Sequence, residues 1–188
     1  GLPDDIEFGP GGLAVLWAEE NSRDSLFGAM RRREAYGTSG TRPIVRLFGG
    51  WEYPADLCEQ SGFVATGYSK GVPMGGDLPP RPPSSAAPRF AVSALADPGA
   101  AGHPGTPLQR IQIVKGWVAQ GESHERVFDV AGNPQNGADV DLATCTPRGA
   151  GFESLCTVWS DPEFEPSERA FYYARVLENP SCRWSAHV

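Results

Sequence analysis

The pattern of apolar residues is most regular in the second half of the chain. Residues 108–118 and 122–130 are two runs rich in Ile, Val, Phe and Trp, and Gln120 and Gly121 separate them. Runs of β-branched and aromatic residues joined by a short link that contains glycine are typical of a β-hairpin. The pattern therefore predicts a long two-stranded hairpin.

Further apolar runs bounded by turn residues predict additional strands. They cover residues 13–17, 44–48, 89–95, 139–143, 155–159 and 170–177, and one more strand is expected near residues 63–64. The continuous run 13–17 favours a strand buried on both faces, and the aromatics on both faces of 170–177 favour the middle of a sheet. Because 23 glycines and 18 prolines supply many turns, the chain is predicted to be mainly β, an antiparallel β-sandwich.

One segment, residues 21–33, has the spacing of a helix instead. Asn21 is suited to cap its first turn, and the arginines at 31–33 complement the negative end of the helix dipole. Gly37 or Gly40 is expected to supply a left-handed exit from the helix. Leu26, Phe27, Ala29 and Met30 form an apolar stripe. The segment is therefore predicted to be an amphipathic helix that docks on an apolar surface.

Charge and length exclude two classes of partner. The net charge of −7 argues against nucleic acid, because such binding requires Lys and Arg to neutralise phosphates. No apolar run approaches the roughly 20 residues that a membrane helix needs, so no membrane span is expected. The proline-rich stretch 78–88 is interpreted as a surface loop inside a domain.

The four cysteines point to disulfides rather than to a metal ribbon or redox motif, because none forms a Cys-x-x-Cys pair. Cys145 and Cys156 flank a loop rich in Pro and Gly between two predicted strands, and we expect them to pair. Cys58 and Cys182 are less certain partners. Disulfides favour an exported protein, periplasmic or extracellular.

Side chains that could bind a ligand directly are scattered. His103, His124 and His187 show no short spacing, so no metal site is expected in this chain. The oxygen-rich stretch 129–141 lacks the ordered spacing of a calcium loop and is interpreted as a polar hairpin loop. The tryptophans at 51, 117, 159 and 184 are either a sugar-stacking platform or, as we favour, core residues.

Several segments resemble a known family. They are residues 17–27 (WAEENSRDSLF), 33–43 (REAYGTSGTRP), 72–78 (VPMGGDL), 109–117 (QRIQIVKGW), 156–162 (CTVWSDP), 171–176 (FYYARV) and 179–184 (NPSCRW). These segments resemble the C-terminal part of a bacterial family of undefined function. That family is related to PHP-type (polymerase and histidinol phosphatase) metallohydrolases, including carbaryl-hydrolase-like enzymes.

The resemblance implies an organisation in two parts. Residues 1–42 would be the end of a metallohydrolase barrel, one strand plus one helix, and residues 43–188 a β-sandwich domain with the proline-rich loop. In that family the metal ligands lie in His-x-His and Asp-x-His segments, and neither pattern occurs here. The resemblance therefore places a divalent metal in an upstream barrel, which would be the partner of this chain.

The implied function is that of an accessory C-terminal domain of a metal-dependent hydrolase, inactive alone. Glu19 and Glu20 follow the barrel-like strand, where a barrel keeps its reactive end, and one of them is a candidate for the active centre. A helix-leading acid explains them equally well. The alternative function is a non-catalytic carbohydrate- or surface-binding β-sandwich module.

Overall fold

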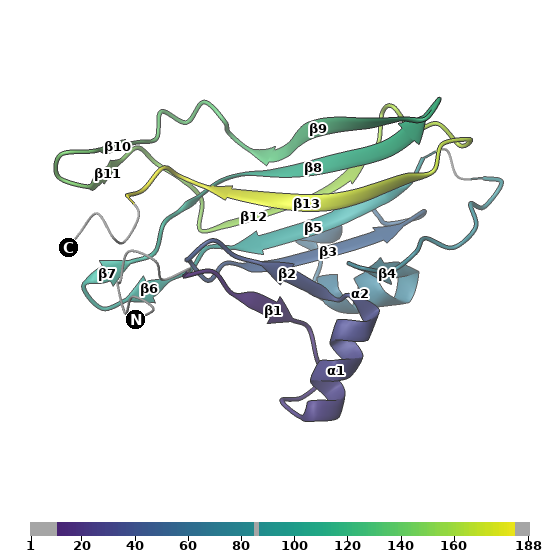
Figure 1. Cartoon of the computed structure of the whole chain (residues 1–188), viewed down its shortest axis with the longest axis horizontal. Helices are drawn as coiled ribbons and strands as arrows, with labels where there is room; N and C mark the ends of the chain where they lie inside the picture. The colour runs from purple at the N-terminus through teal and green to yellow at the C-terminus, as the bar shows by residue number, and fades with distance from the viewer. Residues whose placement is uncertain (1–10, 85–86, 183–188) are drawn as a thin grey trace.

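The computed structural model describes residues 11–84 and 87–182. Its elements, in chain order, are β1 (Ala14–Leu16), α1 (Arg23–Arg32), β2 (Ala35–Gly37), β3 (Ile44–Gly50), η2 (Leu57–Glu59), α2 (Phe63–Lys70), β4 (Gly71–Pro73), β5 (Arg89–Leu95), β6 (Gly99–Ala100), β7 (His103–Pro104), β8 (Leu108–Ala119), β9 (Glu122–Gly132), β10 (Asp139–Asp141), β11 (Thr146–Arg148), β12 (Ser154–Ser160) and β13 (Ala170–Glu178). The chain is mainly β, and every strand pair is antiparallel (Figure 1).

Two larger sheets lie one above the other (Figure 1). One has four strands in the order β12-β5-β3-β4, and the other has three in the order β13-β8-β9. Strand β12 contacts β9 and β8 of the other sheet, and β13 contacts β3. The three-stranded sheet is therefore stacked on the β12-β5-β3 side of its wider neighbour.

The space between these two sheets holds the main core. The buried members of this core are Val92, Ala94, Leu108, Ile111 and Leu155. Two aromatic contacts continue it: the rings of Phe90 and Tyr172 lie 4.4 Å apart, and those of Phe128 and Trp159 lie 4.9 Å apart. Because each contact joins one sheet to the other, the core fixes how the layers are stacked.

A helical layer covers the opposite face of the four-stranded sheet, formed by α2 and η2. Phe48, Tyr53, Leu57 and Ala91 form a second buried cluster there. Gly67 allows α2 to approach closely, because a Cβ at this position would lie 2.6 Å from the Phe48 ring. The Tyr53 hydroxyl donates a hydrogen bond of 2.7 Å to the Gly67 carbonyl. Strand β5 is consequently buried on both faces.

The predicted hairpin is confirmed as β8 and β9, with Gln120 and Gly121 at the turn in left-handed backbone conformations. Two other expectations are wrong. Residues 63–64 begin helix α2 instead of a strand, and the strand near 170–177 is an edge strand, because β8 and not β13 is the central strand of its sheet. The aromatics on one face of β13 are exposed, with Phe171 64% and Tyr173 41% accessible to solvent, while Tyr172 on the other face is half-buried.

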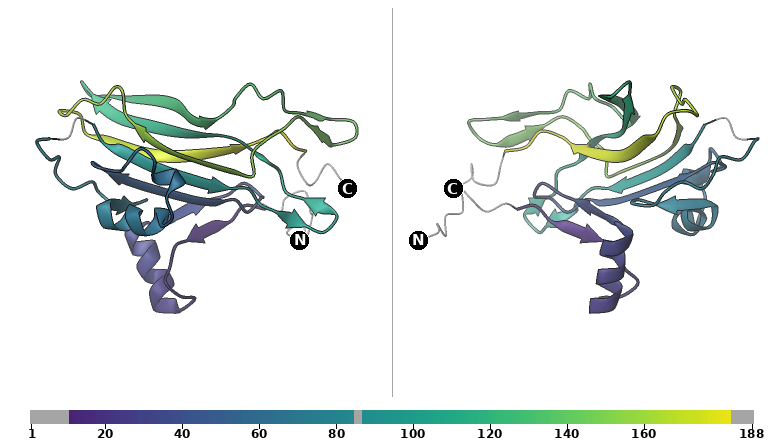
Figure 2. Two further views of the ribbon diagram at one scale, coloured as in Figure 1. Left: turned by 180° about the vertical axis from the view of Figure 1, so that it is seen from behind. Right: turned by 45° about the vertical axis from the view of Figure 1, so that its right-hand side comes forward.

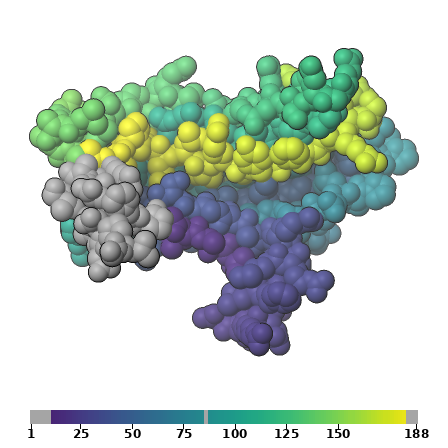
Figure 3. Space-filling model, viewed as in Figure 1, coloured from purple at the N-terminus to yellow at the C-terminus, as the bar shows by residue number. Residues whose placement is uncertain are grey.

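Residues 14–37 form a small unit in which β1 and β2 pair antiparallel and α1 connects them. The expectation that residues 13–17 are buried on both faces is wrong, since Leu13 and Ala14 are exposed. The described residues contain no barrel. Both views in Figure 2 and the space-filling view in Figure 3 show α1 projecting away from the sheets.

The ends of α1 differ from the prediction by a few residues. Ser22, not Asn21, is the N-cap: its backbone is extended, and its hydroxyl accepts a hydrogen bond from the Ser25 N–H. The helix ends at Arg33 in the left-handed conformation (φ 59°), and the cap N–H bonds to the Ala29 and Met30 carbonyls. Neither Gly37 nor Gly40 is needed, because Arg33 itself makes the exit turn.

The expected disulfide between Cys145 and Cys156 is wrong. Cys156 bonds to Cys58 and Cys145 bonds to Cys182, with Cα–Cα distances of 5.8 Å and 5.5 Å. The pairing follows from the layers: Cys156 lies on β12, and η2, which carries Cys58, packs against that strand. The Cys58–Cys156 disulfide therefore joins the helical layer to the edge of the four-stranded sheet.

We expect the Cys58→Ser/Cys156→Ser double variant to lose about 4 to 5 kcal/mol of unfolding free energy, because that bridge closes a loop of 98 residues. Urea unfolding measures the loss. The Cys145→Ser/Cys182→Ser variant is the matched comparison, with a loop of 37 residues and a smaller expected loss. A non-reduced tryptic digest that linked Cys145 to Cys156 would contradict this connectivity.

Candidate functional site

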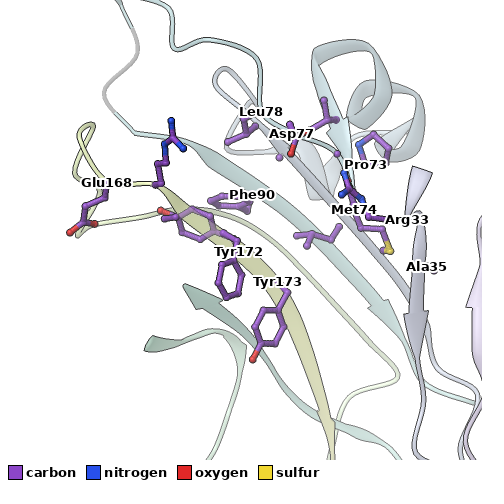
Figure 4. A pocket seen from close by; sticks show the side chains of 18 residues that line it. Arg33, Ala35, Pro73, Met74, Asp77, Leu78, Phe90, Glu168, Tyr172 and Tyr173 are labelled. Carbon is purple, nitrogen blue, oxygen red and sulfur yellow. The ribbon is translucent and has the colours of Figure 1, made fainter. Parts of the chain in front are cut away.

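A hollow among the described residues lies where the two sheets differ in width. The three-stranded sheet ends at β13, while β4 and the loop after it continue beside it. The groove between them has a volume of roughly 670 Å³ (Figure 4). Its lining residues are Arg33, Ala35, Leu47, Gly49, Val72, Pro73, Met74, Gly75, Gly76, Asp77, Leu78, Phe90 and residues 168–173. We call it the β13 groove.

The floor of the β13 groove is apolar. Leu47 and Gly49 of β3 contribute to it, and so does Phe90 of β5, which is paired with Gly49. Gly49 leaves space above this floor, because a Cβ at this position would lie 3.2 Å from the Leu78 side chain and 3.4 Å from the Phe90 ring. Val72 of β4 extends the floor outward. Apolar side chains of a ligand would find apolar partners along this surface.

The rim of the groove carries charges of both signs. Arg33 is anchored by a hydrogen bond of 3.1 Å from its Nε to the Gly75 carbonyl. The side chains of Arg169 and Asp77 make no ion pair or hydrogen bond with other residues in the described part of the chain. These two charged groups are therefore available to a ligand.

A buried ionic cluster supports one end of the groove. The Lys115 ammonium lies 3.1 Å from an Asp161 carboxylate oxygen and 3.2 Å from one of Glu168, and it donates to the Glu163 carbonyl. The side chains of Lys115 and Asp161 are 2% and 0% exposed. The Tyr172 hydroxyl donates to Asp161 at 2.6 Å. Burial first, and then this bond to a carboxylate, raise the pKa of Tyr172 far above its ordinary value.

A second polar cluster, around Glu34, attaches the α1 unit to the rest of the molecule. The buried Glu34 carboxylate accepts a hydrogen bond from the Tyr68 hydroxyl of α2, and Arg46 lies 3.8 Å away from it. The Arg46 guanidinium also stacks on the Trp17 ring, 3.2 Å from its centre. Burial and the bond to Glu34 raise the pKa of Tyr68. The cluster therefore holds one wall of the groove, formed by Arg33 and Ala35, against the sheet.

The groove offers several kinds of contact to a ligand. Within residues 11–84 and 87–182, its lining includes no Ser, Cys or His side chain. The carboxylate of Glu168 is engaged by Lys115, and the Tyr172 hydroxyl by Asp161. What remains is an apolar floor, two charged side chains without partners and the edge of a strand.

In the comparison with protein-family models, the chain matches "Protein of unknown function (DUF3604)" over residues 3–188. The chain belongs to this family. No curated protein and no solved structure matches it.

The candidate acids of this DUF3604 chain lie away from the groove. Glu19 and Glu20 are exposed in the bend that precedes α1, and neither lines the groove. Their proposed role in an active centre stays a prediction. Among residues 11–84 and 87–182, no three His, Cys, Asp or Glu side chains gather as metal ligands would. His103 and His124 are exposed and lie on separate strands, and His187 is outside the described residues.

The tryptophans named from the sequence do not form one surface. Trp159 packs between Phe90 and Phe128, and Trp117 stacks on His124. The Trp51 Nε1–H donates to the Pro79 carbonyl. Trp184 lies outside the described residues.

The oxygen-rich stretch 129–141 also lacks a common centre. Asp129 accepts from Gln112 and faces Arg110, and Asp141 pairs with Arg148. Its oxygens are used to connect strands and turns, as expected of a polar hairpin loop.

Sequence reasoning missed the groove residues Arg169, Tyr172 and Asp77. A local signal exists only for the wall near Asp77: Gly75 has a left-handed backbone (φ 85°), and a Cβ there would lie 2.3 Å from the Arg33 carbonyl oxygen. The groove itself depends on the number of strands in each sheet. No motif in the sequence predicts that number.

The buried tyrosines predict a loss of stability in alkali. Burial raises the pKa of Tyr53 to about 12, from an ordinary value of 10.0. Above about pH 10 the unfolded chain therefore releases the Tyr53 proton and the folded chain does not, so the unfolding free energy falls as pH rises. The fall is at most about 1.4 kcal/mol per pH unit for each such tyrosine.

Urea unfolding between about pH 9 and pH 12 measures this slope. The Tyr53→Phe variant should show a shallower slope, while its constant offset at neutral pH reports the lost hydrogen bond to Gly67. Equal slopes for the variant and the parent would contradict the assignment.

Proposed function

We propose that this chain is the accessory C-terminal domain, a β-sandwich, of a metal-dependent hydrolase related to the PHP type. It docks on an upstream catalytic barrel that holds the divalent metal. The resemblance of residues 17–27 and 33–43 to that class supports the relation, and the lack of His-x-His and Asp-x-His patterns in the chain supports a metal centre upstream. The bond hydrolysed would be an ester, carbamate or phosphoester.

The observation that carries the docking proposal is the apolar surface of α1. Phe27 is 59% and Met30 57% exposed, although both belong to the apolar stripe of an amphipathic helix. Of the helix residues only Ala29 is buried. Because the helix projects from the body (Figure 2), the stripe is left without a covering layer in the described part of the chain.

Docking would bury these exposed apolar side chains, and their burial would stabilise the complex. Full burial of a Phe or Met side chain is worth about 1.5 to 3 kcal/mol. Leu13, which is 42% exposed, directly precedes β1, the first strand of this unit. The Glu34 cluster holds the α1 unit rigidly on the sheet, so little conformational entropy is lost when a partner covers α1.

The alternative, a carbohydrate-binding module built on Trp51, Trp117 and Trp159, receives less support from the structure. These rings are half-buried and engaged with neighbouring rings or with the Pro79 carbonyl. A stacking platform requires rings that share an open face.

Export is part of the proposal. The two disulfides are typical of proteins that fold in oxidising compartments. In the described part of the chain, no helix has the length and apolar character required to cross a membrane.

Hydrogen exchange tests the docking proposal. In a polypeptide that includes the upstream barrel, amides of α1 should exchange more slowly than in the isolated chain, because the partner covers Phe27 and Met30. The Phe27→Asp/Met30→Asp variant should lose this added protection. Leu142→Asp is the control, since Leu142 is 83% exposed in the distant β10–β11 hairpin. Equal exchange of α1 in the long and short chains would refute docking.

Metal analysis tests the hydrolase proposal separately. The longer polypeptide should retain about one or two divalent metal ions per chain after dialysis, as PHP-like catalysis requires, and the isolated chain should retain none. Hydrolysis of model esters should follow the metal. A stoichiometric transition metal in the isolated chain, or none in the longer one, would overturn the assignment.

A further inference from the structure

We propose that the β13 groove accepts an extended polypeptide segment, which pairs with the free edge of β13 as an added antiparallel strand. Its apolar side chains would rest on the groove floor, and a carboxylate near its C-terminal end would meet Arg169. This binding site is independent of the docking surface on α1.

The first argument is the way β13 lines the groove. Four consecutive residues, 170–173, contribute to the lining. Because side chains alternate between the two faces of a strand, consecutive residues can line one cavity only along the edge of that strand. Strand β13 pairs with β8 on one side and with no described strand on the other. Every second residue of β13 therefore directs its N–H and C=O toward the groove.

The second argument is that this edge lacks the usual protection against pairing. In natural proteins, charged residues, proline, β-bulges or short length prevent an edge strand from pairing with a further strand. The edge strand β9 of the same sheet carries Glu122, Glu125, Arg126 and Asp129, and β4 is three residues long and ends at Pro73. In β13 the bulge lies at the far end, between Leu177 and Glu178, and the groove half is Ala-Phe-Tyr-Tyr.

Arg175, the only arginine of β13, does not prevent pairing at this edge either. The Nε of Arg175 donates to the Gln112 side chain at 2.8 Å, and Gln112 in turn donates to Asp129. Arg175 is therefore directed across its own sheet toward β8 and β9. The exposed rings of Phe171 and Tyr173 lie nearly parallel, with an interplanar angle of 12°. The Phe171 ring lies over Gly116 of β8, where a Cβ would be 2.3 Å from it, so this ring does not cover the free edge.

The dimensions suit a short strand. Four residues of a β-strand span about 13 Å. The volume of roughly 670 Å³ falls within the range of about 300 to 1,000 Å³ typical of ligand pockets. Strand addition gains affinity from the backbone ladder and specificity from pockets for alternate side chains, and the floor of Leu47, Val72 and Leu78 supplies such apolar contacts.

The charges fix the direction of the added strand. Arg169 directly precedes β13 and has no ion pair with the described residues. An antiparallel partner would place its C-terminal end beside the start of β13, where this guanidinium can bind a carboxylate. The neighbouring Glu168 does not neutralise Arg169, because Lys115 holds its carboxylate. Asp77, on the facing wall, excludes a second acidic group there.

The test uses a fluorescein-labelled octapeptide with the sequence Thr-Val-Thr-Val-Thr-Val-Thr-Glu and a free C-terminal carboxylate. Fluorescence anisotropy with the intact chain should show saturable binding. The matched control peptide is N-methylated at alternate residues, which removes backbone donors and keeps every side chain. It should bind at least about tenfold more weakly. Nuclear magnetic resonance should show shifts of the 170–173 amides on binding of the unmodified peptide.

Two variants localise the binding. Arg169→Glu should weaken it by about tenfold through charge reversal, and Leu78→Glu should do so by placing a charge on the groove floor. Leu142→Glu is the control on a distant exposed residue and should leave binding unchanged. Circular dichroism verifies that each variant is folded.

Three results would overturn the proposal. One is the absence of binding at about 1 mM peptide, another is equal affinity for the N-methylated peptide, and the third is indifference to both groove variants. Dimerisation of the chain through residues 170–173, detected by sedimentation, would identify a second copy as the occupant and likewise refute the proposal. Failure of these experiments leaves the docking of α1 untouched, because the surfaces differ.

Discussion

Lys115 and Asp161 place opposite charges between the two larger sheets, where neither side chain has appreciable access to water. Desolvating two charges is costly, so such a pair adds little net stability compared with apolar residues of the same size. Removing one partner, however, would leave a buried charge uncompensated. Both charges are compensated when the central strand β8 lies beside the end of β12, so the pair favours this arrangement over one that separates them.

Other features depend on this arrangement. Tyr172 reaches Asp161 from β13, and Glu168 reaches Lys115 from the segment before it. The start of β13 is consequently held in place from two sides, and Phe90 supports the Tyr172 ring from the other sheet. The free edge of β13 beside the groove is thus rigid. A rigid edge loses little conformational entropy when another strand pairs with it.

How much the sequence could reveal differs between local and tertiary features. Local patterns predict the hairpin around Gln120 and Gly121, the strand at residues 89–95 and the helix before Arg33. The structure confirms the type of each of these elements. Phe63 and Val64 predict a strand, because both residue types favour strands, but the segment forms a helix in which Phe63 packs on the Phe48 ring. The groove and the disulfide partners depend on which layers meet. The periodicity of apolar residues along the chain does not indicate which layers pack together.

The disulfide connectivity has a consequence for how the protein matures. In an unfolded chain, Cys145 and Cys156 are near neighbours, about eleven residues apart, whereas Cys58 and Cys156 are separated by 98 residues. Loop-closure entropy favours the short loop over the long one by about 2 kcal/mol. Oxidation before folding would therefore trap Cys156 with the wrong partner. The native bridges require either that η2 dock on β12 before oxidation or that thiol exchange later correct the first bridge. The yield of correctly bridged protein therefore depends on the isomerase capacity of the compartment in which it folds.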